Sequence, residues 1–192
     1  MYINPKNQLD TNSNTDIQKI IELLKSAGQE YAIKPGEAVI KQGQLCDFFF
    51  IVDSGSFRAY RYSNDKEVTI GFTFKGDIDT VPYAFINNTH STETIEAITA
   101  STIIKIHRST LDALFTQHPA MRNFIQGLLA HYIEVLILRF IEFKTVTAEM
   151  SYYKLHDRQP DEVSRIPLKY IASYLGISQE RLSRIRNKQR LT

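Results

Sequence analysis

The segment Arg165–Arg186 reads RIPLKYIASYLGISQERLSRIR and contains the clearest local pattern in the chain. Leu168–Leu175 is predicted as a helix with its apolar residues on one face. Gly176 can adopt the left-handed backbone conformation that ends a helix. Ser178 is a residue type that caps a following helix by accepting hydrogen bonds from its first free amides. The segment therefore predicts two helices joined by a tight turn.

The second of these helices has an apolar inner side and a polar, basic outer side. Leu182 and Ile185 are predicted to face inward, and the polar residues around them outward. Such a pair is typical of a helix-turn-helix whose second helix enters the major groove of DNA. A plain structural helical hairpin is the alternative.

The C-terminal end is basic, whereas the rest of the chain is slightly acidic. Residues 165–192 contain seven Lys or Arg and one Glu, which gives +6. The whole chain has a formal charge of +2, so residues 1–164 sum to −4. This asymmetry favours a polyanion as the partner of the basic end. An ordinary solvated basic helix would carry the same charge.

Upstream, the hydrophobic pattern changes twice along the chain. Helical spacing over residues 16–27 predicts a first helix. Residues 29–107 contain short runs rich in Val, Ile, Phe and Thr, one of which is Thr92–His107, separated by turn signals such as Asn64-Asp65. Such a region predicts an all-β roll, barrel or sandwich, with a hairpin at Asn64-Asp65. After His107 the spacing is helical again, beginning with a short helix for which Ser109 is a candidate cap. The chain as a whole is therefore predicted to be α+β.

The long helix that opens at His118-Pro119 is apolar on more than one face. A helix that packs on its own domain and also against a partner helix shows this pattern. A monomer that buries the extra face on its β domain is the alternative. The predicted dimer interface consists of Phe124, Leu128, Leu129, Tyr132, Leu136 and Phe140.

The sequence predicts a cytoplasmic protein. The N-terminus has no apolar signal segment. Polar residues such as Glu134 and Arg139 interrupt the longest apolar stretch, so we expect no stretch long and apolar enough to span a membrane.

The residues also argue against an enzyme. No Gly-rich phosphate loop and no His-Glu-x-x-His or paired-Cys motif occurs. Cys46 is the one cysteine and the five histidines are scattered, so we expect neither a metal nor a cofactor. The alternative is a cupin-like small-molecule-binding module, or an enzyme, with a structural helical tail.

The segment Ile171–Ser178, followed by Leu-Ser-Arg-Ile at 182–185, resembles the helix-turn-helix of Crp/Fnr transcription regulators, and most closely that of their Bacteroides-type branch. The order of β region, long helix and basic end is also that of the family. The resemblance implies a β-roll of the cyclic-nucleotide-binding type, a double-stranded β-helix or jelly-roll. It implies double-stranded DNA, a second copy of the chain and RNA polymerase as partners. The implied domains are an N-terminal helix and β-roll (1–117), a dimerisation helix (118–145) and a DNA-binding domain (146–192).

The resemblance also implies roles for residues of the basic end. Gln179, Glu180 and Arg184 stand where the family reads bases; they can pair with adenine, cytosine N4 and guanine respectively. Phosphate contacts, which position the protein without reading sequence, are expected from other polar residues nearby. These are Lys169, Ser178, Arg181, Arg186 and Lys188, and Ser183 belongs to the same DNA-binding set.

The expected effector pocket departs from that of cyclic-nucleotide-binding relatives. Gly76-Asp77 resembles the opening of the family's phosphate cassette and Ser91-Thr92 its closing part, where Ser91 replaces the arginine that pairs with the phosphate. Ile133 and Glu134 stand where relatives that sense cyclic AMP have hydroxyl residues. These departures disfavour cyclic AMP, so the resemblance predicts a regulator whose β-roll has an unknown ligand or none.

Overall fold

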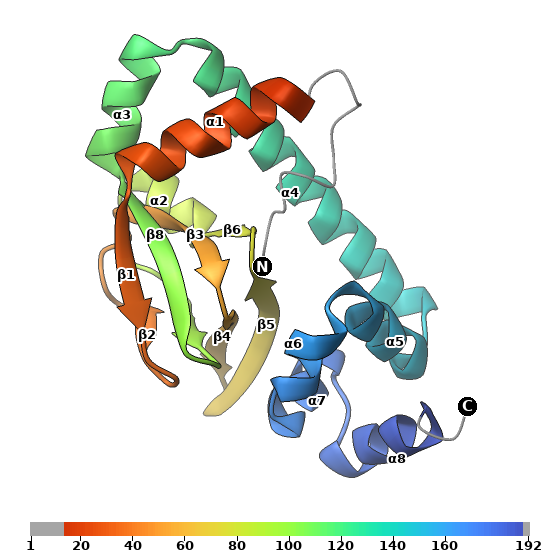
Figure 1. The fold of residues 1–192 in the computed structure, drawn as a ribbon. Helices are drawn as coiled ribbons and strands as arrows, with labels where there is room; N and C mark the ends of the chain where they lie inside the picture. Colours follow the sequence, from red (N-terminus) through yellow and green to blue (C-terminus); the bar gives the residue numbers. More distant parts are fainter. Residues whose placement is uncertain (1–13, 190–192) are drawn as a thin grey trace.

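The computed structural model describes residues 14–189 and contains eight strands and eight helices within them (Figure 1). The strands occupy one region of the chain: β1 (Gln29–Ile33), β2 (Ala38–Ile40), β3 (Phe48–Ser54), β4 (Ser56–Ser63), β5 (Lys66–Phe74), β6 (Ile78–Asp79), β7 (Thr94–Ala97) and β8 (Ser101–His107). The helices are α1 (Asn14–Ala27), α2 (Pro82–Asn87), α3 (Arg108–Gln117), α4 (Ala120–Thr145), α5 (Ala148–Arg158), α6 (Pro160–Arg165), α7 (Leu168–Leu175) and α8 (Gln179–Gln189).

The strands form two antiparallel four-stranded sheets, ordered β1-β8-β3-β6 and β2-β7-β4-β5. Apolar side chains from both sheets fill the space between them. Phe50 and Phe57, one from each sheet, have ring centroids 5.4 Å apart. The predicted β region is therefore a β-roll with an apolar interior.

The predicted hairpin at Asn64-Asp65 is confirmed. β4 pairs with β5 from Ser63 opposite Lys66 onward. Asn64 and Asp65 have φ angles of 49° and 58°, as a two-residue type I′ turn requires. Asn and Asp tolerate the left-handed region better than other non-glycine residues, so this turn forms without glycine.

Helices α1 and α3 and the first half of α4 cover the outer side of the sheet that contains β3. Leu24, Phe49, Leu114, Met121 and Phe124 belong to one buried cluster there. The first half of α4 is thereby attached to the β-roll of its own chain.

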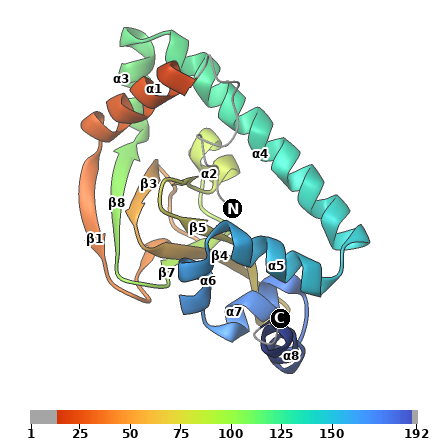
Figure 2. The same cartoon turned by 45° about the vertical axis from the view of Figure 1, so that its right-hand side comes forward.

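The second half of α4 leaves the β-roll and is largely exposed (Figure 2). The segment Met121–Thr145 has a mean hydropathy of 1.6 over 18 residues, and only 11% of that window is buried. By length and composition it could cross a membrane, so the expectation that no stretch is long and apolar enough was wrong. The polar residues that interrupt it, such as Glu134 and Arg139, are too few to offset the apolar majority.

The C-terminal helices pack against the other sheet. After α4 the chain doubles back, and α6 and α7 lie beside β4 and β5 (Figure 2). Phe72 and Phe74 of β5 are buried in the same cluster as Leu155 of α5, Ile171 of α7 and Leu182 of α8. The C-terminal helices and β5 thus share one apolar cluster, which is separate from the interior of the β-roll.

Three local expectations differ from the structure. The run Thr92–His107, read as one strand, contains β7 and β8, which lie in different sheets. The short helix α2 was not anticipated. Ser109, a candidate cap, lies inside α3; the helix begins after His107, which makes no side-chain capping bond.

Candidate nucleic-acid interface

The segment quoted at the outset folds locally as its pattern predicts. Gly176 has a φ of 65° and ends α7, and the amide of Ile177 donates to the carbonyl of Ala172 at 3.0 Å. The hydroxyl of Ser178 accepts from the amide of Arg181 at 3.2 Å and so caps α8. Leu182 is fully buried. The α7–α8 pair therefore presents one side of α8 to solvent.

The exposed side of α8 carries most of the candidate DNA-binding residues. Arg186 and Ser183 are half-buried, and Lys169 is exposed on α7. The carboxylate of Glu180 bonds to its own amide and to the Ser178 hydroxyl, and these bonds lower its pKa. The exposed residues of the set on α8 and its cap are Ser178, Gln179, Glu180, Arg181, Arg184 and Lys188.

Three cations of this set border one hollow. Arg181, Arg184 and Lys188 follow each other at steps of three and four, so they share one face of α8. They line a cavity of about 450 Å³ together with Ser178, Ile185 and Glu149 of α5. Lys188 Nζ lies 3.0 Å from Glu149 Oε1, and this pair lowers the pKa of Glu149 and raises that of Lys188. One of the three positive charges is thus already paired.

The α7–α8 pair is held against the outer face of β4 and β5. Ser173 Oγ accepts from the amide of Thr69 at 3.0 Å and donates to the carbonyl of Glu67 at 3.3 Å. The rings of Tyr174 and Phe72 have centroids 5.2 Å apart. These contacts join α7 to the second sheet over much of its length.

A buried arginine of β4 completes this contact, and sequence reasoning missed it. Arg58 is 3% exposed and pairs with Glu67 at 2.8 Å and Glu96 at 3.4 Å. Its guanidinium carbon lies 4.0 Å from the ring centroid of Tyr60 and 3.7 Å from that of Tyr170 on α7. The signal available in the sequence was an arginine set between the apolar residues Phe57 and Ala59.

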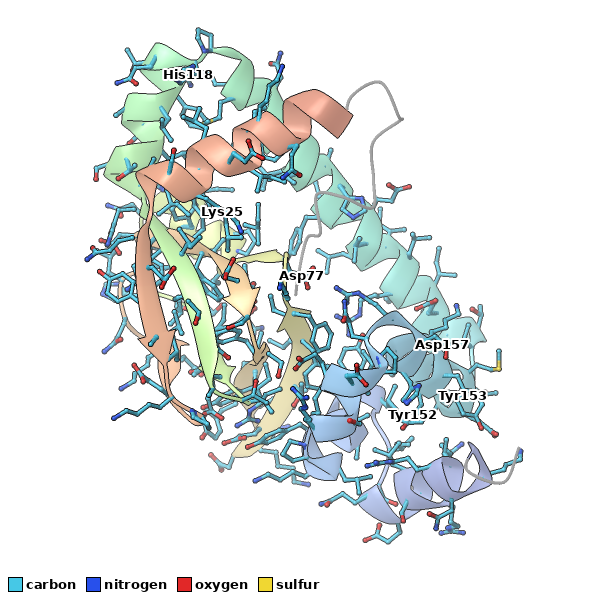
Figure 3. The ribbon with its side chains drawn as sticks, viewed as in Figure 1. Lys25, Asp77, His118, Tyr152, Tyr153 and Asp157 are labelled. Atoms are coloured by element: carbon cyan, nitrogen blue, oxygen red, sulfur yellow. The ribbon has the colours of Figure 1, made fainter. Side chains whose placement is uncertain are left out.

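Gly76 and Asp77 form the turn between β5 and β6, with Gly76 at a φ of 88° (Figure 3). The side chain of Asp77 is buried, and its Oδ2 accepts from the amide of Phe74 at 3.0 Å and from Arg158 Nη2 of α5 at 2.9 Å. Burial raises the pKa of Asp77 to about 6, although Arg158 opposes the shift. This candidate pocket residue is therefore engaged with a C-terminal helix.

The other candidate pocket residues, Ser91 and Thr92, form hydrogen bonds with partners other than Asp77. Ser91 is buried and its hydroxyl donates to the carbonyl of Glu93 at 2.6 Å. Thr92 is exposed and accepts from Arg61 Nη2 of β4 at 3.0 Å. An arginine from another strand thus reaches the segment whose own sequence lacks one.

Ile133 and Glu134 are both exposed on α4, and Ile133 is 57% exposed. Their neighbour Tyr132 faces the β-roll instead. Burial, together with the carboxylates of Glu93 and Asp79, raises the pKa of Tyr132 to about 12. Tyr132, the position before Ile133, therefore interacts electrostatically with acidic residues of the β-roll.

The candidate dimer residues separate into two groups. Phe124 is 8% exposed and packs, with Leu128, against the chain's own β-roll and helices. Leu136 and Phe140 are exposed, at 39% and 62%. Within residues 14–189, no group of three or more His, Cys, Asp and Glu side chains is placed to hold a metal ion.

Residues 31–118 match the family described as the cyclic nucleotide-binding domain. A cGMP-dependent protein kinase from Plasmodium berghei is 40% identical over 99 residues, which make up 50% of this chain and 10% of the kinase. The chain thus aligns with about a tenth of the length of that curated relative.

Two solved structures have a fold similar to that of this chain over most of its length. FixK2 from Bradyrhizobium japonicum aligns with a TM-score of 0.72 at 15% identity, over 85% of both chains. A structure described as a transcriptional regulator of the Crp/Fnr family, from Eubacterium rectale, aligns with a TM-score of 0.67 at 18% identity, over 96% of this chain and 85% of that one. The chain therefore has the β-roll of the cyclic nucleotide-binding domain family at residues 31–118 and the overall fold of Crp/Fnr regulators.

Proposed function

We propose that this chain is a dimeric, sequence-specific DNA-binding transcription regulator with a β-roll sensor domain, and not an enzyme. The observation that carries the proposal is the row of Arg181, Arg184 and Lys188 on the exposed side of a capped helix. The fold it shares with a structure described as a transcriptional regulator supports it. The chemistry of α8 fits this function, because the guanidinium groups of arginine and the ammonium group of lysine bind DNA phosphates directly.

In this proposal the exposed residues divide into two tasks. Arg184 pairs bidentately with guanine, Glu180 accepts from cytosine, and Gln179 pairs with adenine. Arg181 and Lys188 bind phosphates on either side of Arg184 and fix the register of α8 in the groove. Lys169, Arg186 and Ser183 are proposed to contact the backbone at the edges of the same site.

A second copy of the chain is proposed to cover the exposed part of α4. Leu129, Ile133, Leu136, Phe140 and Phe143, here called the α4 seam, follow one another at steps of 4, 3, 4 and 3 residues. That spacing is the apolar repeat of a two-stranded coiled coil. Four of the five are exposed, at 39% to 78%. The pairing of two α8 helices would read the two halves of a palindrome.

Selection of bound sequences from random duplex DNA tests two parts of the proposal together: that the chain binds specific DNA sequences, and that α8 recognises the bases. We expect a palindromic consensus for the wild type and, for Arg184→Ala, loss of preference at one base pair in each half-site. Removing this contact should reduce discrimination by about 1–3 kcal/mol. Arg165→Ala on α6 is the matched control, since Arg165 is 63% exposed and lies outside α8. No enrichment by the wild type, with or without added cell extract, would contradict DNA reading.

The dimer is tested separately by sedimentation equilibrium. Phe140→Glu is expected to convert the chain to a monomer, because a carboxylate in an apolar seam would lose its hydration. Met150→Glu on α5, where Met150 is 51% exposed, should leave the dimer intact. A monomeric wild type would contradict the proposal.

A membrane is the second candidate for covering α4, because the helix is long and apolar enough to span one. We propose a second copy and a cytoplasmic location instead, since the seam follows a regular coiled-coil spacing and the first half of the helix is attached to the β-roll. Flotation with lipid vesicles distinguishes the two: the regulator should stay in the soluble fraction. Contact with RNA polymerase remains a prediction of the family resemblance.

A cyclic nucleotide is the candidate ligand that the family match and the cGMP-dependent kinase support. Against it, Asp77 is engaged by Arg158, Ser91 bonds within its own loop, and Phe50 and Phe57 fill the roll. We propose that the ligand is a different small molecule or that the roll has none. Titration calorimetry with cyclic AMP and cyclic GMP tests this: no binding heat is expected from either nucleotide.

A further inference from the structure

A cavity of about 550 Å³ lies where α4 meets α5, α7 and α8. In Figures 1 and 2 this is the junction at which the chain turns back from α4. Val135, Leu138 and Glu142 supply part of the α4 wall, and their spacing of three and four places them on one face. Phe143 of the α4 seam also lines the cavity, whereas Ile133 and Phe140 do not. A second copy on the seam would therefore reach the edge of the cavity at Phe143 and leave the rest of this wall uncovered.

The walls combine an apolar surface with an excess of positive charge. Val135, Leu138, Leu155 and Leu175 are among the apolar residues that line the cavity. The charged lining consists of Arg139, Lys154, Arg158, Arg181 and the single acid Glu142.

Two of these cations already have acidic partners. Lys154 pairs with Glu142, and Arg158 pairs with Asp77 at 2.9 Å. Arg139 and Arg181 make no ion pair with a carboxylate of the described residues.

Arg139 is held in place for binding. Its Nη1 donates to the carbonyl of Ile70 at 2.7 Å, and its guanidinium carbon lies 4.5 Å from the ring centroid of Tyr174. A guanidinium has five N–H donors, so this one hydrogen bond leaves others available to a ligand. A fixed arginine loses little freedom when it binds a carboxylate bidentately.

We propose that this junction cavity binds a small organic carboxylate with a compact apolar body, and that it is an effector site outside the β-roll. The carboxylate binds between Arg139 and Arg181, and the apolar body packs against Leu138, Leu155 and Leu175. The volume falls within the range of about 300–1,000 Å³ that is usual for small-molecule sites. Apolar walls with a few fixed polar groups are the usual composition of such sites.

Occupancy of the cavity can affect DNA binding directly, because the two sites share a residue. This step rests on the proposed function. Arg181 lines both this cavity and the hollow that holds Arg184 and Lys188. A carboxylate that binds Arg181 removes it from the cations available to DNA phosphates. Occupancy should therefore weaken DNA binding and lower the slope of log affinity against log salt by about one.

The binding test uses 1-naphthoate and the full chain without DNA, with 1-naphthalenemethanol as the uncharged analogue. By calorimetry, we expect the alcohol to bind at least roughly tenfold more weakly, since it lacks the charge-assisted bonds. Arg139→Leu combined with Arg181→Leu should cause a similar loss. Arg165→Leu, which removes an exposed arginine elsewhere, should not.

A second pair of variants leaves both arginines in place. Leu138→Trp, at a position 53% exposed on the cavity wall, should fill part of the space and weaken naphthoate binding. Met150→Trp, an exposed position that does not line the cavity, is the matched control. Because these two variants keep Arg139 and its hydrogen bond to Ile70, they still test the site if the arginine substitutions disturb the fold.

Three results together would support the site. Naphthoate should bind more tightly than the alcohol, the cavity variants should lose this binding, and both control variants should keep it. No binding of naphthoate, equal binding of the alcohol, or binding retained in the cavity variants would overturn it. Binding that leaves DNA affinity unchanged would overturn the coupling to α8 alone. Absence of DNA binding by the naphthoate-free chain, in a sample that still binds naphthoate when it is added, would count against the proposed function and not against the cavity.

Discussion

Asp77 connects two distant parts of the chain through a single side chain. It lies in the β5–β6 turn, and its carboxylate meets Arg158 at the end of α5, 81 positions later. The group is buried, and a buried carboxylate is stable as an ion only where partners replace water. Its ionisation is therefore linked to the docking of the C-terminal helices.

This linkage predicts a pH dependence of stability. Burial raises the pKa of Asp77 to about 6, against about 3.9 for an unfolded aspartate. Because the folded state holds the proton more tightly, this group favours folding most below about pH 4, and that contribution is lost as pH rises through about 6. Compared with Asp77→Asn, the wild type should lose about 2 kcal/mol of unfolding free energy between pH 4 and pH 7.5.

Urea unfolding at four pH values measures this difference. Asp157→Asn is the control, because Asp157 is exposed at 78% on the same helix α5 and should leave the wild-type pH profile unchanged. An Asp77→Asn profile that follows the wild type would show that this carboxyl does not titrate as the structure indicates.

Glu149 is the second residue with a measurable effect, because it neutralises one cation of the proposed DNA site. Its carboxylate binds Lys188 at 3.0 Å. Glu149→Gln should release Lys188 for a phosphate, raise affinity for non-specific DNA and steepen the salt slope by about 0.9. Fluorescence anisotropy over a range of salt concentrations measures both. Glu30→Gln on β1 removes the same charge far from α8, and an equal effect of the two would contradict the local pairing.

At the scale of elements, the turn between α7 and α8 depends on Gly176. Its φ of 65° strains any residue with a Cβ, and an added Cβ would meet only Phe143 Cε2 at an ordinary 3.7 Å. Gly176→Ala should therefore lower the free energy of unfolding by about 1 kcal/mol through backbone strain alone, and Gly176→Asn by less.

Gly127 provides a control of opposite sign. It lies inside α4 with nothing within 4 Å of an added Cβ, so Gly127→Ala should stabilise the chain by about 0.5–1 kcal/mol. Chemical unfolding of both variants tests the pair. Equal effects of the two substitutions would mean that the turn does not need its left-handed residue.

Elements whose causes are local were predictable from the sequence. The α7 bounds, the Gly176 stop and the Ser178 cap depend on residues within a few positions of one another, and the structure has them all. The single-strand reading of Thr92–His107 failed because its break, Ile98-Thr99-Ala100, contains no glycine or proline and continues the β-rich pattern. The six-residue α2 is too short for a helical period to register.

Contacts between distant elements were not predictable in the same way. Arg58 beside Tyr170, and Arg61 beside Thr92, depend on the register of β4 against α7 and against the loop before β7. That Tyr132 and not Ile133 is directed toward the β-roll depends on the rotation of α4 about its axis. None of these contacts is determined by neighbours along the chain, so the sequence could not predict them. The exposed cations of α8 follow from helical spacing within α8 itself, so the sequence could predict those.

At the scale of the whole molecule, the shared apolar cluster raises the question of how many folding units there are. The family resemblance divides the chain into a β-roll domain, a dimerisation helix and a DNA-binding domain. Yet Phe72 and Phe74 of β5 are buried together with residues of α5, α7 and α8. Apolar burial that crosses the division couples the stability of the two sides.

The coupling predicts that a core residue of β5 also stabilises the DNA-binding helices. Phe72 is 1% exposed and its ring contacts Tyr174. Phe72→Ala should cost about 3–5 kcal/mol, and hydrogen exchange should accelerate in α7 and α8 as well as in β5. Val68→Ala, on the same strand at a position 40% exposed, should cost less than about 1 kcal/mol and change exchange little. If α7 and α8 kept their protection in Phe72→Ala, the C-terminal helices would be an independent unit, and a signal in the β-roll could reach α8 only through α4.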